Sequence, residues 1–349
     1  MAGFDKASVD VAEVLGIDGV ASELGVHGEA VKLQNGGCAA NYLIGDDVVV
    51  KAVVGPDARE LAALQVRVLE AVAGTRVGPR PIAGPCACET TRGAGWAIAM
   101  ERAPGEAANV LEREGKVSKA AACGAIGDAL GTLHAANLFV DEATNLGDPR
   151  FLERFLRVDG EVEVELSKGS ADDPFVGWVR ADDWRRLKKV RAALARTDIP
   201  AGLLHGDPYT DNVLLVVDDG TVASSKLVDW EDACIGPLCY DVACALVAAA
   251  FGGREGFEVS VAKKLLEAYT RRRKMDETEV RALPDLMFAN AVACALYRWH
   301  QFHVVDPEAP AAAKAAHLEM QAIATKIENE KFLLDDDLLL LLGNSSTER

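Results

Sequence analysis

The chain of 349 residues lacks an excess of basic residues, since its 54 Asp and Glu residues outnumber its 37 Lys and Arg residues and leave a net charge of −17. Such a charge repels the phosphates of nucleic acids and argues against a nucleic-acid partner. It is compatible with a cationic substrate, although solubility alone also explains it and is the interpretation we favour.

The sequence also lacks the cysteine patterns of metal sites and the segments that target proteins to membranes. None of its eight cysteines forms a C-x-x-C pair and its six histidines are scattered away from them, so no zinc cluster is indicated. Most of the cysteines lie among Ala, Val and Leu, as small buried residues do in a reducing compartment. The N-terminal MAGFDKASVD has no apolar core of a signal peptide, and no apolar run reaches membrane-spanning length. We therefore expect a cytoplasmic protein.

The most informative stretch runs from residue 203 to residue 241, where polar groups alternate with apolar runs. His205-Gly206-Asp207 is followed by Asn212, and two apolar runs then flank a Gly-containing turn. Two short strands joined by such a turn predict a hairpin. The hairpin would bring Asn212, just before one strand, close to Asp229, just after the other.

These polar residues have the chemistry of a phosphoryl-transfer site. A carboxylate and an amide oxygen suit Mg²⁺, which keeps few protein ligands and takes the others from water and phosphates. Asp207 lies in the same loop as Asn212, several residues upstream, and could face a substrate hydroxyl while Asn212 faces the metal. A base, a metal pair and a scaffold are the parts that such a site needs.

This stretch resembles the catalytic loop of the kinase-like small-molecule phosphotransferases, which include aminoglycoside phosphotransferases, choline kinases and type II homoserine kinases. The resemblance rests on H-G-D-x4-N, then V-D-W-E-D-A and a later D-V-A. It implies that Asp207 is the catalytic base, that Asn212 and Asp229 hold Mg²⁺ and that Asp241 braces the loop backbone. For Glu231 two interpretations stay open, a ligand of a second metal ion or an acidic residue on an ordinary turn.

The nucleotide side is predicted from a β-rich run, residues 48–54, with Lys51 at its centre. A lysine is seldom buried without a partner, although on a half-exposed strand it would be merely solvated. The resemblance implies that Lys51 contacts the α- and β-phosphates of ATP and that a glutamate from the following helix, residues 56–73, holds it. Glu60, in R-E-L-x-x-L, is the expected partner, with Glu70 as the alternative.

Two further segments are expected to contact the nucleotide. Gly36 and Gly37 would let the backbone approach phosphate oxygens, although there is no G-x-G-x-x-G and a plain hairpin turn is the alternative. The segment from Glu101 to Ala103 resembles the hinge between two lobes, where backbone groups would pair with adenine. An ordinary Pro-Gly turn at Pro104-Gly105 is the competing interpretation.

The helical remainder offers fewer candidates. Residues 283–303 resemble the substrate-side helix of type II homoserine kinases, which makes Arg298 a candidate for binding a substrate carboxylate. His134 ends another predicted helix and is interpreted as structural. Contact with a cationic substrate is one interpretation of the acidic pairs at 172–173 and 182–183, but acidic surface pairs are usually only solvated.

The acceptor is expected to be a small molecule, because only residues 230–240 separate Asp229 from Asp241. That segment is too short for an ordered peptide-binding platform, and the protein-kinase motifs H-R-D, D-F-G and A-P-E are missing around these positions. A homoserine-like amino alcohol or an aminoglycoside is favoured. Choline or ethanolamine, or a regulator that binds ATP without turnover, are the alternatives.

The resemblance implies an α+β, two-lobed protein-kinase-like fold with ATP and Mg²⁺ between the lobes. We expect a small antiparallel-sheet lobe that binds the nucleotide at residues 1–104. A larger, mainly helical lobe would carry the catalytic and substrate sites at residues 105–349. The boundary is set at Pro104-Gly105, where the composition changes from β-branched to Ala- and Leu-rich.

Overall fold

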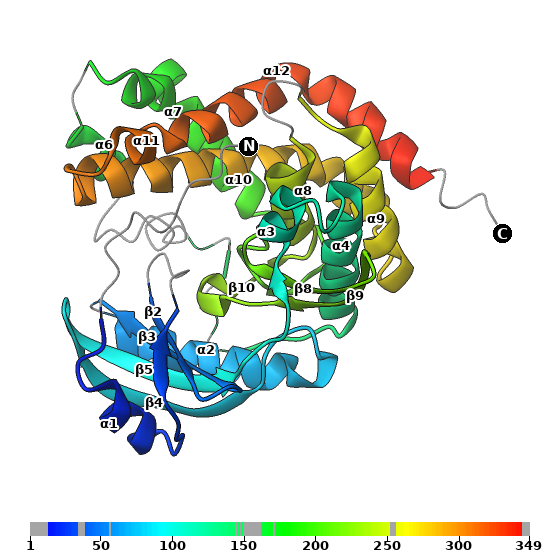
Figure 1. Ribbon diagram of the computed structural model, residues 1–349. Helices are drawn as coiled ribbons and strands as arrows, with labels where there is room; N and C mark the ends of the chain where they lie inside the picture. The colour runs from blue at the N-terminus through cyan, green and yellow to red at the C-terminus, as the bar shows by residue number, and fades with distance from the viewer. Residues whose placement is uncertain are drawn as a thin grey trace.

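The structure is a computed structural model that describes residues 13–33, 39–55, 57–141, 143, 145–146, 148, 162–169, 172–251 and 256–343. It is an α+β protein of two lobes, as predicted (Figure 1). The sheet lobe lies at the bottom of Figure 1, and the helical lobe lies above it. The chain passes between them after β5.

The sheet lobe is built on a five-stranded antiparallel sheet of order β1-β2-β3-β5-β4. Its strands are β1 (Ala30–Lys32), β2 (Ala40–Ile44), β3 (Val48–Val54), β4 (Pro81–Thr90) and β5 (Gly93–Glu101). The β-branched run at residues 48–54 is central β3, and its Lys51 pairs in register with Ile98 of β5. The short helix α1 (Ile17–Glu23) packs against one face of this sheet.

Helix α2 (Ala58–Val72) connects the two lobes. Its buried face, with Ala62, Leu69 and Val72, belongs to the same hydrophobic core as the helical lobe, and Ile98 of the sheet joins that core. The helix also packs against the short η3 (Trp230–Asp232) of the helical lobe. The predicted metal-binding segment therefore rests on an element of the sheet lobe.

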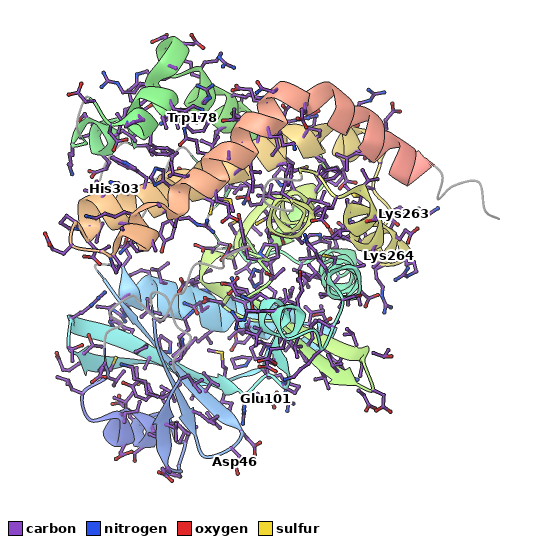
Figure 2. The ribbon with its side chains drawn as sticks, turned by 45° about the horizontal axis from the view of Figure 1, so that its top comes forward. Asp46, Glu101, Trp178, Lys263, Lys264 and His303 are labelled. Atoms are coloured by element: carbon purple, nitrogen blue, oxygen red, sulfur yellow. The ribbon has the colours of Figure 1, made fainter. Side chains whose placement is uncertain are left out.

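The helical lobe surrounds the apolar helix α8 (Cys239–Ala250), which is buried on all sides. Its other long helices are α4 (Lys119–Ala135), α7 (Pro174–Leu194), α9 (Val259–Arg272), α10 (Glu277–His300) and α12 (Ala316–Gly343). Shorter pieces are α3 (Ala108–Arg113), α6 (Val162–Ser167), η4 (Gln301–Val305) and α11 (Ala311–Lys314). Trp178 and His303, labelled in Figure 2, mark the end of the lobe built from α7, α10 and α11.

Two small sheets carry the predicted catalytic segments. The hairpin forms as expected from β8 (Val213–Asp218) and β9 (Thr221–Leu227), and β6 (Glu106–Ala107) pairs with β8. In the second sheet, β7 (Ala201–Leu204) pairs antiparallel with β10 (Cys234–Pro237). The segments before and after the hairpin are thereby held side by side.

Glycine is required where the chain enters the helical lobe. Gly105 has φ of +106°, and a Cβ there would lie 2.6 Å from the backbone oxygen of Leu215 in β8. Only a residue without a side chain fits both the conformation and the contact. The predicted boundary at Pro104-Gly105 thus lies where the backbone passes very close to that of β8.

One expectation about apolar runs needs correction. Residues Glu277–Val305, which comprise α10 and η4, contain an 18-residue window with a mean hydropathy of 1.2, which is long and apolar enough to cross a membrane by length and composition. Charged residues interrupt this segment, so a search for uninterrupted apolar runs does not find it. The apolar window is 83% buried inside the protein, and α10 packs against α7, α8 and α12.

Candidate active site

The catalytic loop is held from behind by Asp241, a fully buried residue in the first turn of α8. Its carboxylate accepts hydrogen bonds from the backbone N–H of His205, at 2.8 Å, and of Gly206, at 3.0 Å. The expectation that Asp241 braces this loop is confirmed. Gly206 has φ of +87°, and a Cβ there would lie 2.1 Å from the oxygen of Asp232, so the loop requires glycine at this position.

A second layer of buried groups holds Asp241. His134 Nε2 lies 3.1 Å from Asp241 Oδ2, and His134 Nδ1 lies 2.9 Å from Tyr269 Oη. Arg273 donates to Tyr269 Oη at 3.1 Å and to Glu279 at 2.7 Å. His134 therefore has the structural role that the sequence suggested, and this role is to fix the brace of the catalytic loop.

Asp207 and Asn212 face each other within the loop. Asn212 Nδ2 donates to Asp207 Oδ2 at 2.7 Å and to the Asp207 backbone oxygen at 2.9 Å. The backbone N–H of Val228 donates to the backbone oxygen of Asn212 at 2.9 Å. This bond brings the following residue, Asp229, to the same end of the hairpin as Asn212. The predicted base and both predicted metal ligands thus lie in one place.

Lys51 reaches this group from the sheet lobe. Its ammonium forms ion pairs with Asp229 and, at 3.1 Å, with Glu231. Burial alone would lower the pKa of Lys51, but the two carboxylates outweigh it and raise that pKa above its ordinary value, so Lys51 stays charged. The buried ammonium group of Lys51 is thus paired with carboxylates, as expected for a buried lysine.

The loop that carries Asp229 is fixed by its neighbour. Asp229 has φ of +67°, a left-handed conformation that Asp tolerates better than most residues. Trp230, only 2% exposed, donates from its indole to Leu227 O at 3.0 Å, and its ring lies 4.6 Å from the His205 ring. This packing joins the catalytic loop to the segment that is predicted to bind the metal.

The expected pair of Lys51 with Glu60 is not formed. Glu60 lies on the exposed side of α2 in its first turn, and Glu70 is exposed as well. The buried face of α2 comprises residues 58, 62, 64, 65, 68, 69 and 72, and Glu60 lies outside it. A polar residue on that face is Gln65, 2% exposed, whose Nε2 has no hydrogen-bond partner among the described residues. The helical periodicity of the apolar residues indicates that Gln65 is buried and Glu60 is not. The prediction relied on the R-E-L motif instead and chose Glu60.

These contacts predict different effects for two glutamates. Glu60→Gln is expected to leave kcat/KM for ATP within about twofold, because the side chain is exposed and does not pair with Lys51. Glu231→Gln should lower it about tenfold, since a hydrogen bond between charged groups contributes about 1.5–3 kcal/mol. Steady-state kinetics at varied ATP measure both values. A tenfold loss in Glu60→Gln with no loss in Glu231→Gln would restore the original assignment.

The predicted hinge offers few open backbone donors. The N–H of Glu101 donates to Arg80 O at 2.9 Å, and that of Arg102 donates to Asp47 O at 2.7 Å. In the described part of the chain, the N–H of Ala103 has no such partner. Glu101, labelled in Figure 2, lies where the sheet lobe meets the helical lobe. Gly36 and Gly37, the other predicted nucleotide contacts, lie outside the described residues.

The side-chain oxygen atoms at this site suit a hard divalent cation that takes most of its ligands from phosphates and water. Among the described residues, no group of three or more His, Cys, Asp or Glu side chains is arranged to hold a metal ion. Asp229 and Glu231 supply two carboxylates that already converge on one cation, the Lys51 ammonium. With the amide oxygen of Asn212 they would supply the few oxygen ligands that Mg²⁺ needs from a protein when phosphates and water complete its coordination.

Residues that sequence reasoning missed tie the loop to α10. Tyr209 donates to Asn290 Oδ1 at 2.9 Å, and Asn290 Nδ2 lies 3.1 Å from Cys244 Sγ and 3.4 Å from Tyr240 Oη. Asn290 is 1% exposed and stands alone among apolar residues of α10, which is the signal that could have revealed it. Arg298, the predicted carboxylate ligand, lies two turns further along α10 and pairs with Glu319 of α12.

Comparison with known proteins identifies the family to which this site belongs. The model of the phosphotransferase enzyme family matches residues 30–283, which include Lys51, Asp207, Asn212 and Asp229. The chain belongs to the phosphotransferase enzyme family. The prediction that the chain belongs to a phosphotransferase family is confirmed.

Similar sequences include homoserine kinases. That of Rhodopseudomonas palustris (strain TIE-1) is 32% identical over 178 residues, which cover 50% of each chain. That of Agrobacterium fabrum (strain C58) is 32% identical over 181 residues, which cover 52% of each. The chain spans about half the length of the curated relatives it matches.

Similar structures share the fold at low sequence identity. A choline/ethanolamine kinase family protein from Mesorhizobium loti has a TM-score of 0.59 and 16% identity, and the match covers 94% of this chain and 99% of the other. An amicoumacin kinase in complex with AMP-PNP and Ca²⁺ has a TM-score of 0.59 and 13% identity, with 92% and 94% covered. The chain therefore shares its fold with these kinases, as the prediction of a protein-kinase-like fold required.

Proposed function

We propose that the protein uses ATP and Mg²⁺ to phosphorylate a hydroxyl group of a small molecule, with a homoserine-like amino alcohol or an aminoglycoside as the favoured acceptor. The observation that carries the proposal is the meeting of Asp207, Asn212, Asp229 and Lys51 from three separate segments. Membership of a phosphotransferase family and the similarity to homoserine kinases support it. Choline or ethanolamine is the alternative acceptor.

Asp207 would act as the base. The Asn212 amide donates to one of its carboxylate oxygens and so fixes the orientation of the group, while the braced loop backbone fixes its position. The acceptor oxygen would form a bond to the γ-phosphorus as the bond from that phosphorus to the β–γ bridging oxygen breaks. ADP leaves, and the hydroxyl proton passes to Asp207. Positioning of this kind supplies most of the catalysis in phosphoryl transfer.

Lys51, Asp229 and Glu231 would change partners when ATP binds. In the structure the lysine holds both carboxylates. The phosphates of ATP would attract Lys51, and Asp229, Glu231 and Asn212 would hold Mg²⁺. The ion, when bound, would neutralise charge on the triphosphate. The two partly exposed carboxylates thus compensate the buried charge of Lys51 before the nucleotide arrives.

The short path from η3 to α8 supports a small acceptor. The segment between Asp229 and Asp241 forms η3 and then β10, which pairs with β7 from residue 201 to residue 204. Most of this segment therefore forms the short helix η3 and a strand that pairs with β7, the strand that leads into the catalytic loop. A peptide-binding platform needs a longer segment at this place, so the open position belongs to a small molecule.

Consumption of ATP in the presence of candidate acceptors tests the proposal. The acceptors are L-homoserine, ethanolamine, choline and kanamycin, and ADP release is followed with and without each of them. We expect acceptor-dependent ADP release that requires Mg²⁺. Binding of ATP without turnover on any acceptor would instead favour a regulatory protein.

A further inference from the structure

A group of side chains on α10 and α12 lies beside the predicted base and has no part in the proposed chemistry. Tyr209, two residues after Asp207, contacts Asn290 at one end of it. Asn290, Cys294 and Arg298 follow one another at intervals of four residues and so share one side of α10. The stripe begins at the catalytic loop and ends at Arg298, about 12 Å further along the helix axis.

Arg298 is a buried cation whose hydrogen-bonding capacity is only partly used. Its side chain is 16% exposed. Its Nη1 donates to the backbone oxygen of Ala316 at 3.1 Å and to Glu319 at 3.4 Å. Over the part of the chain that the structure describes, its Nε and Nη2 make no hydrogen bond, although a guanidinium carries five donors. Donors left open in this way can bind water or a ligand.

The position of Arg298 on α10 favours a side chain that leans toward the catalytic loop. Long side chains on a helix lean toward its N-terminus, which here means toward Cys294 and Asn290. Burial raises the pKa of Tyr209 well above its ordinary value, and among the charged groups Arg298 lowers it while Asp207 raises it. The same two charges act on the buried thiol of Cys294. The guanidinium and the carboxylate of Asp207 thus lie near the same pair of side chains.

This arrangement selects the charge of an acceptor. A cation near the base repels a substrate that carries only positive charge and attracts an anionic group. A guanidinium with paired open donors matches a carboxylate, which it can bind through two parallel hydrogen bonds. Glu319, beside it and with 35% of its side chain exposed, can accept from an ammonium group. The pair therefore presents complementary charges to a zwitterion.

We propose that Arg298 binds the carboxylate, and Glu319 the ammonium group, of an amino acid whose side-chain hydroxyl is directed to Asp207. The assignment rests on the proposed function, because Asp207 defines where the hydroxyl must lie. It narrows the acceptor class to hydroxy-amino acids and excludes aminoglycosides and amino alcohols without a carboxylate. If the ion pair merely ties α10 to α12, its loss should affect all acceptors equally.

Three matched acceptors separate these cases. L-Homoserine carries all three groups, 2-amino-1,4-butanediol lacks the carboxylate, and 4-hydroxybutyrate lacks the ammonium group. We expect wild-type kcat/KM to be highest for L-homoserine. In Arg298→Gln it should fall about a hundredfold or more for L-homoserine and for 4-hydroxybutyrate, chiefly through KM, and less than about threefold for the diol. In Glu319→Gln the losses should instead fall on L-homoserine and the diol.

Controls keep a folding defect apart from a binding defect. Arg281→Gln changes an exposed arginine of the same helix, paired with Glu277, and should leave all three values unchanged. Arg298→Lys keeps the charge and should restore part of the preference for the carboxylate. Thermal unfolding and ATP affinity should match the wild-type values in every variant.

Calorimetric binding of L-homoserine in the presence of AMP-PNP gives an independent readout. The inference predicts binding by wild type that is lost in Arg298→Gln. Equal losses on all acceptors, or a wild-type preference for the diol or for kanamycin, would overturn it and leave the proposed function intact. Binding that depends on Arg298 without any turnover would support the inference and contradict the proposed function.

Discussion

Asp207→Asn is expected to lower kcat about a thousandfold while leaving ATP binding and stability unchanged. Asparagine keeps the size of the side chain and can still accept the hydrogen bond from Asn212, but it cannot take the acceptor proton. General bases contribute on the order of 10²–10⁴ to enzymatic rates. The measurement is ADP release at saturating ATP and acceptor, together with a titration of ATP binding.

The matched control is Asp218→Asn, which changes an exposed aspartate at the end of β8. It should leave kcat within about twofold. Undiminished turnover in Asp207→Asn would show that another group is the base. A parallel loss of ATP affinity would show instead that Asp207 organises the nucleotide site.

Asp241→Ala is expected to reduce the free energy of unfolding by about 3–5 kcal/mol, which is typical when one partner of a buried polar pair is removed. The change would leave the N–H groups of His205 and Gly206 and the ring of His134 without their acceptor. Urea unfolding at neutral pH measures the loss. Turnover should also fall in the folded protein, because the loop that carries Asp207 loses its brace.

The control for this prediction is Asp128→Ala, which removes an exposed ion pair between α4 and Arg272 of α9. Exposed pairs contribute no more than about 1 kcal/mol, so its stability should stay close to that of wild type. Similar losses in the two variants would mean that the buried network around Asp241 contributes little more than a surface pair.

The parts of the site that follow from local pattern were predictable from the sequence. A turn between two apolar runs dictates the hairpin, and the hairpin brings Asn212 to Asp229. A lysine inside a β-rich run demands a buried partner, which the structure supplies. These inferences depend on neighbours along the chain or on direct strand pairing.

The parts that depend on packing between distant elements could not be obtained in the same way. The rotation of α2 about its axis is set by the apolar face that it buries, which places Glu60 outward and Gln65 inward. The partners of Lys51 come from the other lobe, and the nearer of them along the chain, Asp229, is 178 residues away. The contact of Tyr209 with Asn290 likewise depends on how α10 crosses the catalytic loop.

The central claim is that Asn212 and Asp229 hold a divalent cation with the nucleotide while Asp207 serves the acceptor. Binding of Mn²⁺ in the presence of AMP-PNP, followed by electron paramagnetic resonance, tests it without turnover. We expect tight nucleotide-dependent binding in wild type and in Asp207→Asn, and at least tenfold weaker binding in Asp229→Asn. Equal Mn²⁺ affinity in Asp229→Asn and wild type would contradict the claim.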